Sequence, residues 1–454
     1  MNETLFIHSQ DQLRALAQDV LRYAKDMGAS DAAVQISEGS GLSVTVRRGN
    51  VETIEQNKDK GIGVTVYMGG DRAIRRGSAS TSDFSQQSLK ATVEAAYNIA
   101  RFTSADDCAG LPDVDTLEMN PQDLQLCYPW PISVEESIAL AGRAEAAAFA
   151  VDRRITNSEG ASVHAQASHF VSANTRGFMG GYPYSRHTMS VVPIAGRGNN
   201  MQRDDWYSSA RDPALLAEPE AIGRYAAERA LARLDARKIS TRKCPVLFEA
   251  PLAAGLLGAF VQAISGGALY RKSTFLPDSV GTRVFGEHIQ VVEDPHLKGA
   301  VGSSPFDEEG VQTSRRDVVR DGVVQGYFLS TYSARKLGLK TTGNAGGSHN
   351  LTITSTRTTE HDDFVGMLKK MGTGLLVTEL MGQGVNYVTG DYSRGASGYW
   401  VENGVIQYPV EEITIAGNMK TMFKQIIGVG TDTLIRGTRR TGSILVENMT
   451  VAGG

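Results

Sequence analysis

Histidines are the first residues to consider for catalysis, because imidazole binds metals and transfers protons near neutral pH. The chain contains eight histidines, and none lies in a His-Glu-x-x-His motif. The nearest approximation is the pair His164 and His169, but no acid follows His164 to act as a general base. On a strand, this odd spacing places the two rings on opposite faces of a sheet. We therefore predict that this pair forms no metal site.

Two further histidines lie close to acidic residues. Glu287-His288 and Asp294-Pro295-His296 lie across a turn from each other. Imidazole and carboxylate are both zinc ligands, so His288, His296 and a nearby acid form one hypothesis for a metal site. The alternative is that both are ordinary surface or partly buried histidines.

Several other catalytic and binding motifs are absent. Gly61-Ile62-Gly63 is followed by another strand-like run rather than by a third glycine, which excludes a dinucleotide-binding fingerprint. The P-loop and nucleophile-elbow motifs do not occur. The three cysteines are far apart and form no CxxC, so we expect neither a thiolate metal cage nor a disulfide framework.

A cationic segment follows a pair of glycines at residues 266–275. Arg271 and Lys272 lie there beside two hydroxyl residues. Arginine can hold a peptide carboxylate or backbone carbonyl groups, so both residues are candidates for substrate binding. The alternative is an ordinary helix end, where cations are favoured by the helix dipole.

The other candidate binding residues are Glu379, Gln383 and Arg394. Residues 390–395 are expected to form a tight turn that presents Arg394, while Glu379 and Gln383 flank a glycine-rich bend and could face a groove. The alternative is that these are turn and solvent residues.

These residues belong to a glycine-rich stretch, residues 371–419, in which apolar runs alternate with turn signals. The apolar runs cover residues 375–377, 385–388 and 399–401. Asn403-Gly404 between apolar runs is a strong hairpin signal, because both residues tolerate positive φ. Glycine inside strands often marks a close approach by a ligand or partner. The stretch therefore predicts a glycine-rich antiparallel sheet.

The order of helix and strand signals along the whole chain predicts an α+β protein with two domains, 1–236 and 244–454, separated by the charged segment 237–243. Each domain should have helices packed on a largely antiparallel sheet, and the C-terminal domain should carry the large glycine-rich sheet. Helices are expected at 9–27, 83–102, 133–151, 218–236, 253–264, 331–338, 360–370 and 418–427, and the first strands at 32–37, 42–48, 51–55 and 61–68.

Composition limits the class of partner. The 454 residues are 41% hydrophobic and 21% charged, with a formal net charge of −4, as in an ordinary soluble protein. No basic excess indicates nucleic-acid binding, and no apolar run approaches the roughly 20 residues of a membrane span. The N-terminal residues lack the features of a signal peptide, so we expect a cytoplasmic protein with neither nucleic acid nor membrane as a partner.

The chain also resembles one family along nearly its whole length. Residues 77–83, 105–110, 333–339 and 374–418 are similar to the PmbA/TldE chains of the TldD/PmbA metallopeptidase family. The resemblance implies a two-domain α+β fold. It also implies a TldD–TldE heterodimer that trims peptides and unfolded chains, in a family named for modulation of DNA gyrase.

One departure from that family matters for chemistry. In TldD a His-Glu-x-x-x-His motif and a C-terminal cysteine hold zinc. When the motif is placed without gaps, anchored at Arg271-Lys272, it falls on Gly258, Ala259 and Ala263, and all three cysteines lie upstream of Pro251. These residues cannot bind zinc or deprotonate water. The resemblance therefore implies no catalytic residue and no metal in this chain, with zinc in a TldD-like partner.

Three functional hypotheses follow. The first is a non-catalytic subunit that pairs with a TldD-like chain, contacts peptide or unfolded protein, and forms a homodimer when alone. The second is a self-sufficient metallopeptidase that uses His288 and His296. The third is a regulatory protein that binds a topoisomerase without proteolysis.

Overall fold

The computed structural model describes residues 5–70 and 73–453. It contains three β-sheets with helices packed on them, which confirms the predicted α+β class. No helix in these described ranges has both the length and the apolar character needed to cross a membrane.

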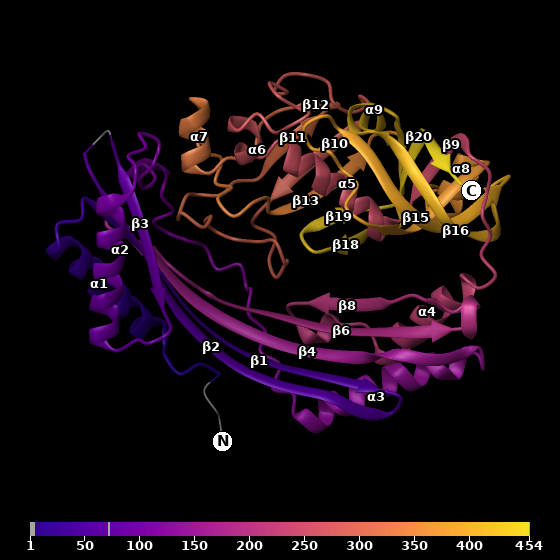
Figure 1. Ribbon diagram of the computed structural model, residues 1–454, viewed down its shortest axis with the longest axis horizontal. Helices are drawn as coiled ribbons and strands as arrows, with labels where there is room; N and C mark the ends of the chain where they lie inside the picture. The colour runs from indigo at the N-terminus through magenta and orange to yellow at the C-terminus, as the bar shows by residue number, and fades with distance from the viewer. Residues whose placement is uncertain (1–4, 71–72, 454) are drawn as a thin grey trace.

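The first sheet is long and curved and extends along one side of the molecule (Figure 1). Its strand order is β3-β2-β1-β4-β6-β7, with β5 paired to β4 and β8 paired to β6. The strands are β1 (Asp31–Arg47), β2 (Asn50–Met68), β3 (Arg75–Thr81), β4 (Ile155–Asn174), β5 (Met179–Gly180), β6 (Pro183–Ala195), β7 (Gln202–Arg203) and β8 (Trp206–Ala210).

The two longest hairpin strands differ from the sequence prediction. Residues 32–37 and 42–48 were expected to form separate strands, as were 51–55 and 61–68, but each pair forms one continuous strand. Gly39 and Gly41 lie inside β1 without ending it. A Cβ atom on Gly41 would lie 2.5 Å from Oδ1 of Asn57 on β2, so glycine there permits a close approach between strands.

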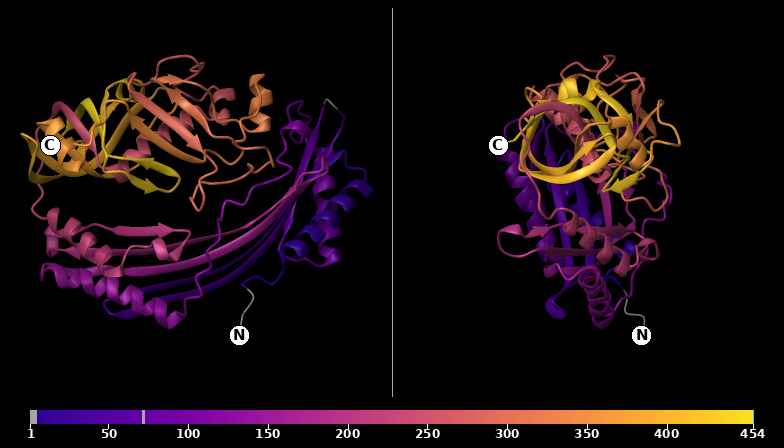
Figure 2. Two further views of the ribbon diagram at one scale, coloured as in Figure 1. Left: turned by 180° about the vertical axis from the view of Figure 1, so that it is seen from behind. Right: turned by 90° about the vertical axis from the view of Figure 1, so that its right-hand side faces the viewer.

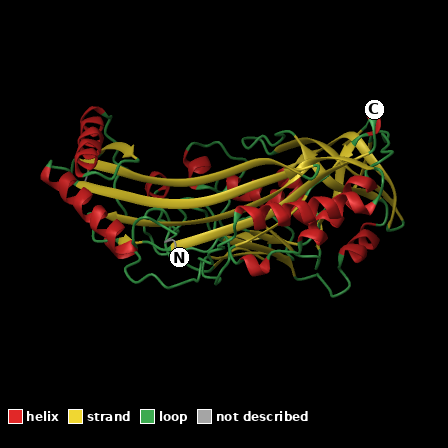
Figure 3. Ribbon diagram, turned by 90° about the horizontal axis from the view of Figure 1, so that it is seen from below, coloured by secondary structure: helices red, strands yellow, loops and turns green. Residues whose placement is uncertain are grey.

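Two pairs of helices cover opposite ends of this sheet (Figure 3). Helices α1 (Gln10–Asp26) and α2 (Gln86–Phe102) pack on one end, and α3 (Val134–Val151) and α4 (Pro219–Ala232) pack on the other. The predicted capping box of Ser133 and Glu136 is present at the start of α3. Helix α2 begins later than expected, because Ser85 rather than Asp83 is its N-cap.

The second half of the chain contains two six-stranded sheets. In the first, the order is β12-β11-β10-β13-β19-β18. Its strands are β10 (Ile289–Asp294), β11 (Arg316–Arg320), β12 (Val323–Val324), β13 (Asn350–Ser355), β18 (Leu434–Arg436) and β19 (Arg439–Thr441).

The other sheet has the order β16-β15-β14-β9-β20-β17 and closes on itself, because β16 also pairs with β20. The resulting ring of C-terminal strands is visible end-on in Figure 2. The strands are β9 (Arg242–Phe248), β14 (Gly374–Met381), β15 (Asp391–Glu402), β16 (Val405–Asn418), β17 (Ile426–Val429) and β20 (Ile444–Ala452).

Helix α5 (Ala250–Ala263) packs against strands of both sheets, β14 of the closed sheet and β18 and β19 of the other. It shares a large apolar core with them, including Phe260, which is fully buried. The shorter helices of this half are α6 (Gly266–Tyr270), α7 (Thr331–Leu337), α8 (Phe364–Met371) and α9 (Met419–Lys424).

Turn chemistry explains the connections within the glycine-rich region. Asn403 and Gly404 have φ values of 51° and 75° and join β15 to β16, which confirms the predicted hairpin. The expected tight turn at residues 390–395 is wrong, because residues from Asp391 onward form β15. The apolar run 385–388 lies mainly in the loop between β14 and β15 rather than in a strand. Residues 391–395 pair with β16, and this pairing outweighs their local turn propensity.

Ion pairs join the two halves at both ends. Arg229 of α4 donates from Nη1 and Nη2 to Glu249 at 2.6 and 3.2 Å, and from Nε to Asp204 at 3.2 Å. At the other end, Lys336 of α7 donates to Asp106 at 2.9 Å. These contacts hold the second half above the uncovered face of the curved sheet.

Candidate substrate-binding pocket

A pocket of about 310 Å³ lies between α5 and the loop that connects β14 to β15. Its volume is at the lower end of the usual range for ligand pockets, which is roughly 300–1,000 Å³. Helix α5 presents small residues, Gly255 and Ala259, with Leu252 and Leu256 beside them. The opposite wall is lined by Leu380, Gly382, Gln383, Gly384, Val385, Tyr387, Tyr392 and Arg394.

Glycines allow the loop to fold back along β15. Gly382 has a φ of +71°, which favours glycine, and the Ser393 amide donates to the Gly384 carbonyl at 2.7 Å. A Cβ atom on Gly384 would lie 1.6 Å from the Ser393 carbonyl oxygen, so no larger residue fits without moving the loop. Val385 then forms a bridge with Tyr392. The glycines therefore position the wall that carries Gln383.

The polar groups of the pocket are cationic or neutral. Tyr392 is 4% exposed, and its buried hydroxyl lies beside the Arg394 guanidinium group, whose charge limits the rise in the Tyr392 pKa that burial causes. Burial raises the pKa of Tyr392 to about 12, so the phenol is a neutral donor at pH 7. Arg394 donates weakly from Nη2 to the Leu380 carbonyl at 3.5 Å, and its buried Nε has no partner. These groups suit an anion or a carbonyl oxygen rather than a metal ion.

The helix that borders this pocket carries the positions of the expected zinc motif, Gly258, Ala259 and Ala263. A Cβ atom on Gly258 would lie 3.0 Å from Cζ of Arg439, so a guanidinium group fills the space a side chain at this position would enter. Burial lowers the pKa of Arg439, and its Nε has no partner. Glycine, alanines and a cation do not fit zinc, which requires imidazole, carboxylate or thiolate ligands.

The structure brings together two of the five candidate binding residues. Gln383 and Arg394 line this pocket. Glu379 instead pairs with Arg233, the C-cap of α4, at the contact between the two halves. Arg271 caps α6 and donates to its neighbour Tyr270 at 2.9 Å, and Lys272 follows with a φ of 55°.

The sequence analysis missed two residues, Tyr392, which lines the pocket, and Arg439, which packs on α5 at Gly258. Tyr392 was missed because residues 390–395 were predicted to form a turn. Its position between Asp391 and Arg394, in a run punctuated by glycines, could have indicated it. Arg439 belongs to β19 and reaches α5 only through tertiary packing, so no local pattern indicates it.

The two histidines of the hypothesised metal site, His288 and His296, are engaged in hydrogen bonds. His288 is 4% exposed, and its ring nitrogens contact the Ser355 hydroxyl at 2.8 Å and the Ile426 carbonyl at 2.9 Å. Nε2 of His296 contacts the Thr313 hydroxyl at 3.0 Å. His164 and His169 both lie on β4, where His164 is exposed and His169 is buried. In residues 5–70 and 73–453, no three His, Cys, Asp or Glu side chains gather as metal ligands.

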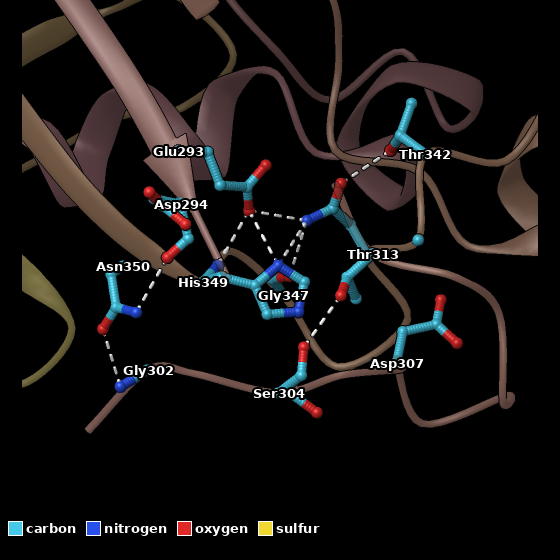
Figure 4. A network of polar contacts seen from close by, with 12 residues as sticks. Glu293, Asp294, Gly302, Ser304, Asp307, Thr313, Thr342, Gly347, His349 and Asn350 are labelled. Carbon is cyan, nitrogen blue, oxygen red and sulfur yellow. Dashed lines mark hydrogen bonds and ion pairs between the residues drawn. The ribbon is translucent and has the colours of Figure 1, made fainter. Parts of the chain in front are cut away.

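Glu293 is the centre of a buried polar network (Figure 4). One carboxylate oxygen accepts from the His349 amide at 2.8 Å, from His349 Nδ1 at 3.0 Å and from Asn344 at 2.8 Å. The other accepts from Arg316 Nε at 2.8 Å. Burial alone would raise the pKa of Glu293, but His349 and Arg316 outweigh it and hold the pKa at about 2. Both carboxylate oxygens of Glu293 are occupied by these hydrogen bonds, so the role of the network is to fix the loops between β10 and β13.

A larger set of cavities lies along the curved sheet, and two of the three also border loops of the second half. Cavities of about 650, 840 and 270 Å³ share lining residues, among them Gln35, Tyr184 and Gly346. The sheet contributes small polar side chains such as Ser37 and Ser80. Such a surface can hydrogen-bond an extended chain without selecting particular side chains.

The chain matches three family models, described as PmbA/TldA metallopeptidase domain 1 (residues 32–100), central domain (127–234) and C-terminal domain (241–453). It is 49% identical to the Metalloprotease PmbA of Escherichia coli O157:H7 over 94% of this chain and 93% of that protein.

Two solved structures share the fold. A suggested modulator of DNA gyrase from Bacteroides thetaiotaomicron has a TM-score of 0.91 and 26% identity, with 98% of this chain and all of that chain covered. TldE from Thermococcus kodakarensis has a TM-score of 0.81 at 18% identity over 96% of this chain and all of that one, which supports the fold alone. The matched domains and the close PmbA relative together establish that this chain belongs to the PmbA/TldD metallopeptidase family.

Proposed function

We propose that this chain is the non-catalytic, TldE-type subunit of a cytoplasmic TldD–TldE zinc metallopeptidase that trims peptides and unfolded chains. The observation that carries the proposal is on α5. When the TldD zinc motif is placed without gaps from Arg271-Lys272, its positions would fall on Gly258, Ala259 and Ala263, and the Arg439 guanidinium group fills the space beside Gly258. A metal-bearing partner would therefore supply the zinc and activate the water.

In this pair, this chain would hold the substrate and help to enclose the cavity that admits an extended peptide. The cavities along the curved sheet offer hydrogen-bonding groups to an extended peptide, which agrees with low sequence specificity. Met381 and Val388 flank the pocket loop and are 44% and 58% exposed, and a partner subunit could cover them. In the absence of the partner, the same apolar residues would favour a homodimer.

The test is a reconstitution in which a TldD-like chain and this chain are assayed for peptide trimming separately and together. We expect cleavage by the pair to be much faster than by either chain alone, and chelation to abolish it. Chelator-sensitive cleavage by this chain alone would support a self-sufficient peptidase instead. Trimming that does not depend on this chain would contradict the proposal and favour a regulatory role such as the one suggested for the Bacteroides relative.

A further inference from the structure

A group of aromatic rings interrupts the small polar surface of the curved sheet. Phe170 on β4 and Tyr184 on β6 line both the cavity of about 840 Å³ and the cavity of about 270 Å³, and Tyr182 lines the smaller one. The other sheet residues that border the larger cavity are mostly serine, threonine, glycine and glutamine. We refer to Phe170, Tyr182 and Tyr184 as the aromatic cluster. It offers apolar ring surface to a ligand that lies along the sheet.

Packing between the two halves accounts for part of this cluster. The ring of Phe306, from the second half, lies edge-to-face with Phe170 at 6.1 Å and with Tyr182 at 5.6 Å between ring centroids. The Tyr182 hydroxyl also contacts the Ser304 hydroxyl at 2.8 Å. The ring of Tyr184 instead has Phe170 as its aromatic neighbour in the described residues, at 6.4 Å, and Tyr184 is 37% exposed. Contact between the halves therefore does not explain Tyr184.

The ring of Tyr184 is uncovered where comparable rings are covered. Within residues 5–70 and 73–453, the exposed aromatic side chains are Phe102, Tyr184 and Tyr225. Arg101 lies over the ring of Phe102 and Arg229 over that of Tyr225, each at 5.8 Å from the ring centroid. No described lysine or arginine lies over the ring of Tyr184 in this way. Its apolar face is therefore free to contact a ligand.

Small residues lie beside Tyr184 on the sheet. Tyr184 is opposite Ser168 on β4, and Ser168 is opposite Gly39 on β1. A Cβ atom on Gly39 would lie 2.8 Å from the Ser168 hydroxyl oxygen, so the serine side chain already covers this glycine. Residues directly opposite on neighbouring strands share one face of a sheet. The ring of Tyr184 therefore stands beside a low surface that leaves room for a side chain.

The charged groups near the rings do not favour a charged ligand. Arg211, Asp307 and Glu308 line the same cavity of about 270 Å³. Arg211 donates to backbone carbonyl groups, and Asp307 accepts from backbone amides. The guanidinium group would repel a cation, and the carboxylate of Glu308 would repel an anion. An uncharged ring suits this place best, because aromatic rings gain from edge-to-face contact with one another.

We propose that the aromatic cluster is a subsite for one aromatic side chain of an extended peptide that lies along the curved sheet. The side chain packs against the exposed ring of Tyr184, above Ser168 and Gly39. The neighbouring peptide residues contact the small polar surface, so a preference at one position is combined with low selectivity elsewhere. The subsite rests on the rings and the cavities, and the choice of a peptide as the ligand rests on the proposed function.

The test uses the full chain without a partner and measures binding by calorimetry. The probes are capped serine–glycine peptides of equal length, with phenylalanine, leucine, lysine or alanine at the centre. We expect the phenylalanine peptide to bind about ten-fold more tightly than the alanine peptide, the effect of burying one large apolar side chain. Equal binding of these two peptides, or no binding of any peptide at millimolar concentration, would overturn the proposal. Binding of the leucine or lysine peptide as tight as that of the phenylalanine peptide would overturn the assignment to an aromatic side chain.

Matched variants locate the binding. Tyr184→Ser removes an exposed ring, so it should fold normally, bind the phenylalanine peptide about ten-fold more weakly and leave binding of the alanine peptide unchanged. Tyr184→Phe keeps the ring and should keep the preference for phenylalanine. Phe102→Ser is the control, because Phe102 is an exposed ring at the end of α2 that lines none of the three cavities. An equal preference for phenylalanine in Tyr184→Ser and the wild type would overturn the proposal.

This assay is independent of the partner chain. If reconstituted trimming depends on this chain but the phenylalanine peptide has no advantage in binding, the proposed function stands and the aromatic subsite is wrong. If the preference is present and depends on Tyr184 but trimming does not depend on the chain, the subsite stands and its assignment to a peptidase subunit is wrong.

Discussion

Replacing Glu293 by glutamine should remove a large pH-dependent part of the stability. Glu293 is 1% exposed and accepts four hydrogen bonds from His349, Asn344 and Arg316. Its pKa falls from 4.5 to about 2 on folding. At about 1.4 kcal/mol per pKa unit, this corresponds to about 3 kcal/mol.

The direction with pH follows from proton binding. Between pH 4.5 and 2 the unfolded chain binds the proton more tightly than the folded chain, so this part of the stability is present above pH 4.5 and is lost as the pH falls toward 2. Glutamine cannot ionise and also places an amide group among donors. Glu293→Gln should therefore be less stable by about 3 kcal/mol at pH 7, and the difference should shrink as the pH falls through this window.

Urea unfolding at several pH values between 7 and 3 measures this difference. Glu287→Gln is the control, because Glu287 is 72% exposed and forms only a surface ion pair with Arg283, so it should change stability by less than about 1 kcal/mol. A cost for Glu293→Gln that is below about 1 kcal/mol at pH 7, or that stays the same at pH 3, would refute the reasoning.

Two other predictions concern the packing of α3 on α4 and a buried ion pair. Gly223→Ala should destabilise the protein by roughly 1–3 kcal/mol, because the new Cβ would lie 2.0 Å from the Ala144 carbonyl oxygen where α4 meets α3. Gly142→Ala on α3 meets nothing within 4 Å and should stabilise by about 0.5–1 kcal/mol, so equal shifts in the unfolding midpoint would contradict this. Arg229→Met should cost about 3–5 kcal/mol in chemical unfolding, because it leaves Glu249 partly buried without its cation and leaves Asp204 only the longer contact with Arg233 at 3.6 Å, and a cost below about 1 kcal/mol would contradict this reasoning.

Local signals predicted most of the elements of the fold. The capping residues Ser9 and Ser133 begin helices as expected, and Asn403-Gly404 forms its hairpin, because these effects depend on a few neighbouring residues. The long strands β1 and β2 were divided in the prediction, at the glycine-containing residues 38–41 of β1 and at the polar residues 56–60 of β2. Their pairing with neighbouring strands keeps the backbone extended.

The candidate site was only partly predictable. Gln383 and Arg394 share a pocket because the β14–β15 loop folds back, and glycine in the sequence indicated such a bend. The local sequence could not show that Glu379 lies apart from Gln383 and Arg394, because its contact with Arg233 depends on how the two halves pack. Arg439 comes from a hairpin far along the chain, and only the packing of β19 on α5 places it beside Gly258.

Metal analysis of each subunit tests the central claim most directly. The chain should be purified alone and together with a TldD-like partner, and zinc should be measured in each separated subunit. The account predicts about one zinc per partner chain and none held by this chain, because Gly258, Ala259 and Ala263 offer no ligand. One tightly bound zinc per isolated chain, with peptide cleavage that stops on chelation, would contradict it.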